Sequence, residues 1–182
     1  MTINRCFWLA IYYGIARHLP GSTSLFGKLL HSKSIRYYCC KHIFKSIGTN
    51  VNIEKGAWFG RGSDVEIGDN SGIGYNAHIL YNTKIGSDVM MGRNMVILES
   101  LHLHNRTDIP MRLQGQRKDR SQVIFDDDIW IGNDVLIIGS KHIRTGTILA
   151  ARTVLVKDFP PYSIIGGNPS SLIKNRILLL MR

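Results

Sequence analysis

Residues 125–158 read FDDDIWIGNDVLIIGSKHIRTGTILAARTVLVKD, and a large apolar residue occupies every sixth position of this stretch. These anchors are Phe125, Ile131, Ile137, Ile143, Leu149 and Leu155. An earlier stretch keeps the same spacing, with anchors at Ile67, Ile73, Ile79, Ile85, Met91 and Ile97. Two runs with the same six-residue spacing indicate an internal repeat. The period of such a repeat is the strongest sequence evidence for the fold.

The spacing is incompatible with an α-helix. Six residues advance about 240° around a helix axis, so successive anchors would scatter over its surface. In extended chain, side chains alternate between two faces, so residues six apart share one side. An unbroken strand over residues 125–158 would however span on the order of 110 Å. That is too long for a compact chain of 182 residues, and the strand must therefore bend at regular intervals.

Each unit of the repeat also carries residues that suit a corner. The third residue after the anchor is Asn or Asp at Asn70, Asn76, Asn82, Asp88, Asn94, Asp128 and Asp134, and both types tolerate left-handed backbone. The fourth is small or β-branched at Ser71, Ala77, Thr83, Val89, Ile129, Val135, Thr147 and Thr153, which suits a second inward position. Glycine often follows the anchor directly. We therefore predict stacked coils of about eighteen residues that form a triangular prism, the hexapeptide form of a parallel β-helix.

The repeat divides the chain into three parts. Residues 1–46 lack the pattern and are predicted to form a helical N-terminal cap, residues 47–158 the prism, and residues 159–182 a C-terminal tail and cap. Two extra residues precede Ile67, which predicts a bulge or longer corner near residues 60–66. The ends of the prism need covering because a bare coil exposes unpaired backbone groups.

The N-terminal segment is apolar and basic. The stretch FWLAIYYGIARHLP, residues 7–20, is apolar for only about nine residues, whereas a bilayer span needs about 20, and it lacks a signal-peptide cleavage site. Residues 25–46 are predicted to be helical and amphipathic. We expect both segments to be helices that cover the end of the prism. The alternative is that this basic, aromatic N-terminus rests on a membrane surface.

Charge and cysteine content limit the possible partners and the cellular compartment. The chain has a net charge of +10, so an anionic partner is expected. Nucleic acid is not favoured, because no nucleic-acid module is present; a polyanionic cofactor, a phosphate-linked substrate or a lipid surface stays open. Cys6, Cys39 and Cys40 form neither a disulfide framework nor a zinc spacing, which is typical of a reducing cytoplasm. A cytoplasmic location is predicted, with the inner face of the membrane as the alternative.

The repeat is interrupted once, between Ile97 and Phe125. These anchors lie 28 residues apart, so a loop excursion over residues 99–121 must leave the prism. Long excursions from a compact fold are usually functional or disordered. This one is basic and opens with His102 and His104, and histidine is the side chain best suited to move protons near neutral pH.

With these motifs in order, the chain resembles the hexapeptide-repeat acyltransferases, especially the maltose, galactoside and capsular-polysaccharide O-acetyltransferase type. The resemblance covers roughly residues 40–176. It rests on IGDNSGIGYNAHI, the looped-out histidine followed by IPMRLQG, DDDIWIGNDV, and VLVKDFPPYSIIGGNPSSLIK. It implies a left-handed prism, a homotrimer with active sites between subunits, and acetyl-CoA bound between neighbouring prisms. It also implies a loop histidine as general base and no metal.

The resemblance assigns roles to individual residues. His102 matches the loop histidine and would take the proton from the acceptor hydroxyl. Asn76 matches an asparagine that holds the acceptor or steadies the histidine, although it also suits a plain corner residue. The positions that match contacts to the acetyl-CoA donor are Trp130, Gly132, Asn133 and Ala151 beside the pantetheine arm, and Lys157 and Arg176 near the nucleotide phosphates.

The last coils depart from the family pattern. GSK stands where the family has Pro-Gly-Val, which would place Lys141 at an inward position unless its ammonium reaches out to solvent. Arg144 and Arg152 replace glycine, Val156 replaces threonine, and Leu101 precedes the histidine where Asn or Gly is usual. Either the donor site is reshaped or the catalytic function has been lost.

The leading hypothesis is transfer of an acetyl group from acetyl-CoA to a sugar hydroxyl, in a bacterial surface or capsular polysaccharide unit or its precursor. Acylation of an amino sugar or of serine is the nearest alternative. A γ-type carbonic anhydrase would need converging zinc ligands, and His78, His102, His104 and His142 do not reproduce that family's spacing. A catalytically silent scaffold is the third alternative, with Arg144 and Arg152 blocking the cofactor groove.

Overall fold

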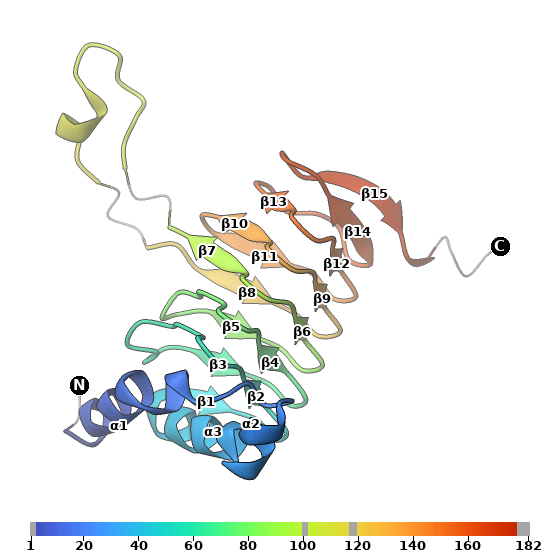
Figure 1. Cartoon of the computed structure of the whole chain (residues 1–182). Coiled ribbons are helices and arrows are strands. Elements are labelled where there is room, and N and C mark those ends of the chain that lie inside the picture. The colour runs from blue at the N-terminus through green and yellow to red at the C-terminus, as the bar shows by residue number, and fades with distance from the viewer. Residues whose placement is uncertain (1–2, 100–101, 117–119, 178–182) are drawn as a thin grey trace.

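The computed structural model describes residues 3–99, 102–116 and 120–177. Helices gather at one end of a stack of coils, and a long loop stands out from the stack near its middle (Figure 1). The helices are α1 (Ile3–Gly14), η1 (Ala16–His18), α2 (Leu25–Leu29) and α3 (Ser32–Ile43), with η2 (Met111–Leu113) in the loop. The helical N-terminal segment is thus confirmed. The helical stretch expected over residues 25–46 divides in two, because His31 adopts left-handed backbone with φ of 50°.

The strands are short, and most of them are two or three residues long. Along the chain they are β1 (Ser46–Ile47), β2 (Asn52–Ile53), β3 (Glu66–Ile67), β4 (Gly72–Ile73), β5 (Lys84–Ile85), β6 (Met90–Met91), β7 (Val96–Leu98), β8 (Val123–Phe125), β9 (Trp130–Ile131), β10 (Leu136–Ile138), β11 (Lys141–Ile143), β12 (Ile148–Leu149), β13 (Val154–Leu155), β14 (Ser163–Gly166) and β15 (Ser171–Asn175). Each short strand is followed by a corner, as the six-residue spacing predicts.

Strand pairing stacks the coils in parallel. One face has the order β1-β3-β5-β8-β11, a second has β15-β14-β12-β9-β6 with β2-β4 beside it, and a third has β13-β10-β7. Glu66 pairs with Lys84, eighteen residues later, whereas Ser46 pairs with Glu66, twenty residues later. The two extra residues before Ile67 are therefore confirmed. β15 differs from the other strands because it pairs antiparallel with β14.

The corners confirm most of the predicted left-handed positions. Positive φ occurs at Asn70, Asn76, Asp88, Asn94, Asp128 and Asp134. Asn82 is the exception, and its assignment as a left-handed corner was wrong. Its side chain instead donates to the carbonyl of Ser121 at 3.1 Å, and its carbonyl accepts from Gln122 at 3.1 Å. Asn82 therefore packs against the root of the loop rather than against a stacked corner.

The core consists of the repeat anchors and their partners. Eleven of the twelve anchors are buried, and all eight residues at the predicted second inward position are buried as well. Met91 is the anchor that stays partly exposed. The glycines after the anchors have a steric cause: a Cβ on Gly74 would lie 1.9 Å from the carbonyl oxygen of Gly92, and one on Gly132 would lie 2.5 Å from the nitrogen of Ala151. Adjacent coils approach too closely there for any side chain.

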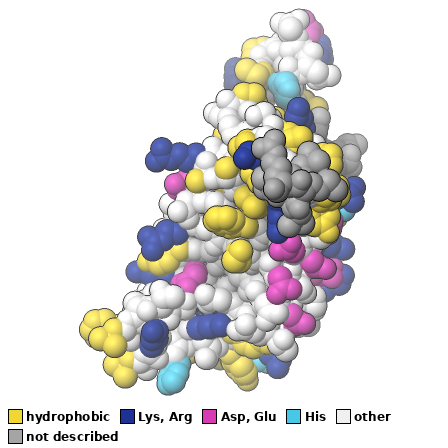
Figure 2. Space-filling model, turned by 90° about the vertical axis from the view of Figure 1, so that its right-hand side faces the viewer, with side chains coloured by type: hydrophobic (Ala, Val, Ile, Leu, Met, Phe, Trp, Pro, Cys, Tyr) yellow, Lys and Arg dark blue, Asp and Glu magenta, His cyan; other side chains and the backbone are white. Residues whose placement is uncertain are grey.

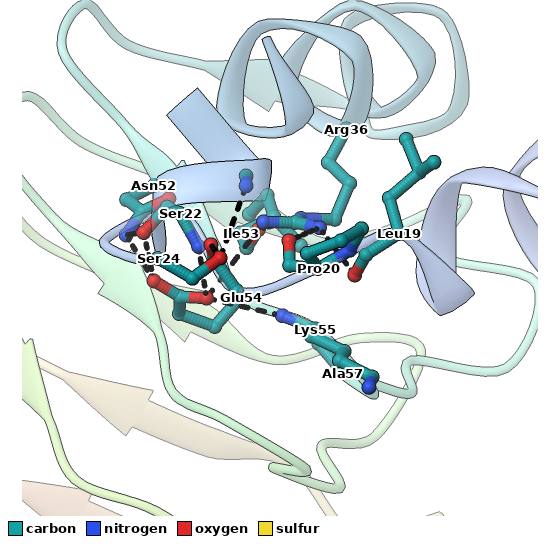
Figure 3. Close-up of polar contacts among 12 residues, drawn as sticks. Leu19, Pro20, Ser22, Ser24, Arg36, Asn52, Ile53, Glu54, Lys55 and Ala57 are labelled. Atoms are coloured by element: carbon teal, nitrogen blue, oxygen red, sulfur yellow. Dashed lines mark hydrogen bonds and ion pairs between the residues drawn. The ribbon is translucent and has the colours of Figure 1, made fainter. Parts of the chain in front are cut away.

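Arg36 attaches the helices to the first coil (Figure 3). Its guanidinium is fully buried and donates to the carbonyls of Ile53, Leu19 and Pro20. It also lies 3.7 Å from the carboxylate of Glu54. Burial alone would raise the pKa of Glu54, but hydrogen bonds from Ser22, Asn52 and Lys55 outweigh it and lower that pKa. Because the carboxylate stays charged, the buried guanidinium has the partner it needs.

Within the described ranges, the structure contains no helix that is long and apolar enough to cross a membrane.

Candidate active site

Asn76 and several predicted donor contacts share one corner of the coil stack. This corner, called the Asn76 corner, follows β4, β6, β9 and β12 and consists of Tyr75–Asn76, Arg93–Asn94, Asn133–Asp134 and Ala151–Arg152. Asn76 donates to Asn94 at 3.5 Å, and Asn94 donates to Asp134 at 2.8 Å. The backbone nitrogen of Arg152 donates to the carbonyl of Asn133 at 2.9 Å. The eighteen-residue coil thus places residues from four coils in one row.

The face beside this corner offers a flat surface. Trp130 lies on β9 between Met90 and Ile148 in register, with 54% of its surface exposed. Gly132 follows two residues later and packs directly against the backbone of Ala151. Since Gly132 and Ala151 have no large side chain, neither residue obstructs an extended ligand beside Trp130. The structure therefore brings Asn76, Trp130, Gly132, Asn133 and Ala151 together.

Lys157 and Arg176 lie elsewhere in the single chain. Lys157 follows β13 on the third face, and its ammonium lies 5.4 Å from the centroid of the Phe159 ring. Arg176 donates to the Asp128 carboxylate at 3.0 Å and to the carbonyl of Gly146 at 2.7 Å, at the corner before β9. The structure does not bring these two basic residues to the Asn76 corner, and the charge of Arg176 is already balanced by Asp128.

A hollow of ≈ 350 Å³ adjoins the Asn76 corner on the side of the N-terminal segment. Its lining residues are Gly21, Thr23, Ser24, Glu54, Gly74, Tyr75, Met91, Gly92, Arg93 and Asn133. The guanidinium of Arg93 lies 5.3 Å from the centroid of the Tyr75 ring. Hydroxyl, amide, aromatic and cationic groups therefore converge on one concave surface, which is typical of a site for a polar small molecule. The sequence analysis missed this hollow.

His102 lies on the loop that leaves the stack after β7 and returns before β8, called the arm (residues 99–121). The side chain of His102 is exposed, and its backbone pairs with Gln116 across the arm. His104 Nδ1 lies 3.2 Å from the carbonyl of His102. Figure 1 shows the arm standing away from its own coils, on the opposite side from β9 and β12. In one chain, His102 is therefore remote from the Asn76 corner.

Glu99 is engaged at the root of the arm. Its carboxylate lies 3.4 Å from the guanidinium of Arg120, so the described contacts pair Glu99 with arginine rather than with His102.

The residues that depart from the family pattern have distinct positions. Lys141 pairs in register with the buried Val123, and its ammonium reaches out to donate to the carbonyls of Ile138 at 2.6 Å and Ser140 at 3.0 Å. Burial lowers the pKa of Lys141. Arg152 is exposed at the Asn76 corner with φ of 61°. Arg144 and Val156 are also exposed, and Leu101 lies outside the described residues.

Two other histidines have structural partners. The ring of His78 stands edge-on to Trp58 at 4.0 Å between centroids, and burial lowers the pKa of His78, with a smaller contribution from Arg17. His142 Nε2 lies 2.7 Å from Asp126. Over residues 3–99, 102–116 and 120–177, no group of three or more His, Cys, Asp or Glu side chains could hold a metal ion.

Comparison with known proteins places the chain in a family. No family model matches it. The Saccharomyces cerevisiae protein YJL218W, named as an acetyltransferase, is 32% identical over 136 residues, covering 74% of this chain and 67% of that protein. The galactoside O-acetyltransferase of Escherichia coli is 26% identical over 137 residues, covering 74% of this chain and 65% of the enzyme. The chain thus spans about two thirds of the length of these relatives.

A solved structure agrees with the sequence relatives. The hexapeptide-repeat acetyltransferase VCA0836 of Vibrio cholerae, complexed with acetyl-coenzyme A, superposes with a TM-score of 0.66 at 22% identity, covering 85% of this chain and 91% of that chain. The two proteins share a fold. Together with the relatives, this shows that the chain belongs to the hexapeptide-repeat acetyltransferases. Its resemblance is to the galactoside and maltose O-acetyltransferase type.

Proposed function

We propose that the protein transfers an acetyl group from acetyl-CoA to a hydroxyl group of a sugar, with His102 as the general base. Membership in the acetyltransferase family supports the reaction, and the name of the Escherichia coli relative supports a sugar acceptor. The complex of the Vibrio cholerae protein supports acetyl-CoA as the donor. We take the coils to wind left-handed, as the resemblance implies.

In this reaction the acceptor oxygen attacks the thioester carbonyl while His102 takes its proton. The tetrahedral intermediate then collapses, the C–S bond breaks, and the proton leaves with the CoA thiol. General-base assistance of this kind typically contributes about 10²–10⁴ in rate. Holding both substrates in one site contributes further, because their encounter is no longer bimolecular.

One observation supports a site shared between subunits: the arm that carries His102 stands on the opposite side of the stack from β9 and β12, which lead into the Asn76 corner (Figure 1). A histidine that serves this corner must therefore come from a neighbouring subunit. A closed homotrimer, in which each arm reaches the next prism, satisfies this requirement. In that assembly Trp130, Gly132, Asn133 and Ala151 would line the pantetheine arm of acetyl-CoA. Lys157 would meet its phosphates, and Arg176 would do so by exchanging Asp128 for them.

The hollow lined by Tyr75, Arg93 and Glu54 is the proposed acceptor site, because it adjoins Asn76 and offers the polar groups that sugar hydroxyls need. A unit of a bacterial surface or capsular polysaccharide, or its precursor, is the acceptor we favour. An amino sugar or serine is the alternative, since a histidine base serves amines as readily as hydroxyls. The silent-scaffold alternative requires Arg144 and Arg152 to block the cofactor groove.

A transfer assay tests the function directly. Purified protein is incubated with acetyl-CoA and matched acceptors (galactose, galactosamine and serine), and thiol release is followed together with the mass of the product. We expect O-acetylated sugar to form. Acetylation of galactosamine or serine alone would favour the alternative, and no transfer with any acceptor would favour the silent scaffold.

Subunit mixing tests the shared site. His102→Ala removes the base, and Ala151→Glu places a charged side chain on the donor surface, so each variant alone should retain about 1% of wild-type activity or less. Random trimers formed from equal amounts of both should regain about a quarter of wild-type activity, because some sites combine an intact arm with an intact corner from a neighbour. If each site lies within one subunit, mixing restores nothing.

A further inference from the structure

The N-terminal part of the chain has only one sign of charge. The first acidic residue is Glu54, whereas residues 1–53 contain seven lysines and arginines. Lys28, Lys33 and Lys41 are exposed on or next to α2 and α3. Arg36 is buried and serves to attach the helices. Lys28 and Lys41 are therefore exposed cations of α2 and α3, and the exposed Lys33 donates to Asn50 at 3.1 Å.

Large apolar side chains lie among these lysines. On α2, Leu25, Phe26 and Leu29 are 78%, 66% and 71% exposed, while only Gly27 of that helix is buried. A helix that packed solely against its own protein would turn such residues inward. Isolated exposed apolar residues are ordinary, but a contiguous group of them marks a contact with something else.

Exposed apolar side chains occur on all three helices. The rings of Phe7 and Trp8 lie 5.4 Å apart, and those of Trp8 and Tyr38 lie 5.2 Å apart. Ile35 precedes Tyr38 by one turn of α3, and a single residue pair, Leu30–His31, joins α3 to α2. We call this surface the cap face; its exposed apolar members are Ile3, Phe7, Leu25, Phe26, Leu29, Leu30, Ile35 and Tyr38.

The figures place the cap face at one end of the molecule. In Figure 1, α1, α3 and α2 lie across the end of the stack that is farthest from β15. Figure 2 shows hydrophobic, basic and histidine side chains at this end. The arm leaves the stack several coils away. A partner on the cap face would therefore leave the arm free.

We infer that the cap face binds the surface of a membrane rich in anionic lipids. Helices that lie in the headgroup region combine Leu, Phe and Trp with lysine or arginine, and each basic residue near an anionic surface strengthens binding about fivefold. The cap face has both features, and no acidic residue of segment 1–53 opposes an anionic surface. The inference is independent of the proposed catalytic function, because it uses none of its residues.

Vesicle co-sedimentation tests the inference with the full-length protein. The probes are vesicles of phosphatidylcholine alone and vesicles containing about 30% phosphatidylglycerol, an anionic lipid. Wild type should bind the anionic vesicles and be released as salt increases. The variant Leu25→Glu/Leu29→Glu should bind at least about 100-fold more weakly, because it loses apolar contact and adds two repelling charges.

The matched control is Met111→Glu/Leu113→Glu. It adds the same two charges at exposed apolar positions of the arm, and it should keep near-wild-type vesicle binding. Circular dichroism checks that both variants remain folded. Equal losses in the two variants would overturn the inference, because net charge alone would explain them. Absence of vesicle binding by wild type, with a lower oligomeric mass for Leu25→Glu/Leu29→Glu, would assign the cap face to contacts between copies of this chain.

Discussion

The His102→Ala variant is expected to transfer acetyl groups about 10²–10⁴ times more slowly than wild type, because the acceptor hydroxyl loses its general base. His102 is exposed on the arm, so the substitution should leave the fold intact. Donor binding should also be kept, since the proposed donor contacts lie on the coils. The measurement is the turnover number at saturating acetyl-CoA, with the acceptor found in the transfer assay.

His104→Ala is the matched control for this variant. His104 lies two residues further along the arm, and its Nδ1 lies near the carbonyl of His102 rather than near another side chain. Its loss should change the turnover number little. A larger loss in His104→Ala than in His102→Ala would move the general base to His104. Near-wild-type rates in both would mean that the arm supplies no base.

Arg36→Leu is expected to lower the free energy of unfolding by about 3–5 kcal/mol, since breaking a buried ion pair by removing one member is strongly destabilising. In this protein the loss also leaves the carbonyls of Leu19 and Pro20 without their donor (Figure 3). The measurement is urea unfolding followed by tryptophan fluorescence, to which Trp8 on α1 contributes.

Arg61→Leu supplies the comparison for Arg36→Leu. Arg61 is exposed and lies over the Tyr81 ring at 4.5 Å, and surface substitutions usually change stability by no more than about 0.5 kcal/mol. Equal stability of the two variants would show that the guanidinium of Arg36 does not hold the helices on the first coil.

Most of the fold could be predicted from the repeat, because each core and corner residue is determined by its position within a six-residue unit. An anchor such as Ile131, an inward residue such as Val135 and a corner residue such as Asp134 each follow from a fixed place in a six-residue unit. The same regularity revealed the interruptions, since any insertion shifts the spacing of the anchors. The two extra residues before Ile67 and the excursion after Ile97 were therefore predictable. Asn82 was not, because its geometry depends on the root of the arm.

Only those site residues that belong to the hexapeptide repeat could be placed from the sequence. Asn76, Asn133 and Ala151 share a corner because whole coils separate them. Arg176 lies beyond the last repeat, directly after the antiparallel strand β15, and no spacing rule could place it beside Asp128. Thr23 and Ser24 in the hollow come from the N-terminal segment, which has no repeat.

The most direct test of the account is the binding of acetyl-CoA, measured by calorimetry for wild type and for Ala151→Glu. Ala151 is exposed at a corner, so its replacement should preserve the fold, which circular dichroism would verify. The account predicts binding in the micromolar range for wild type, despite the altered last coils, and its loss in Ala151→Glu. Folded wild-type protein that shows no binding, or an Ala151→Glu variant that binds equally well, would contradict it.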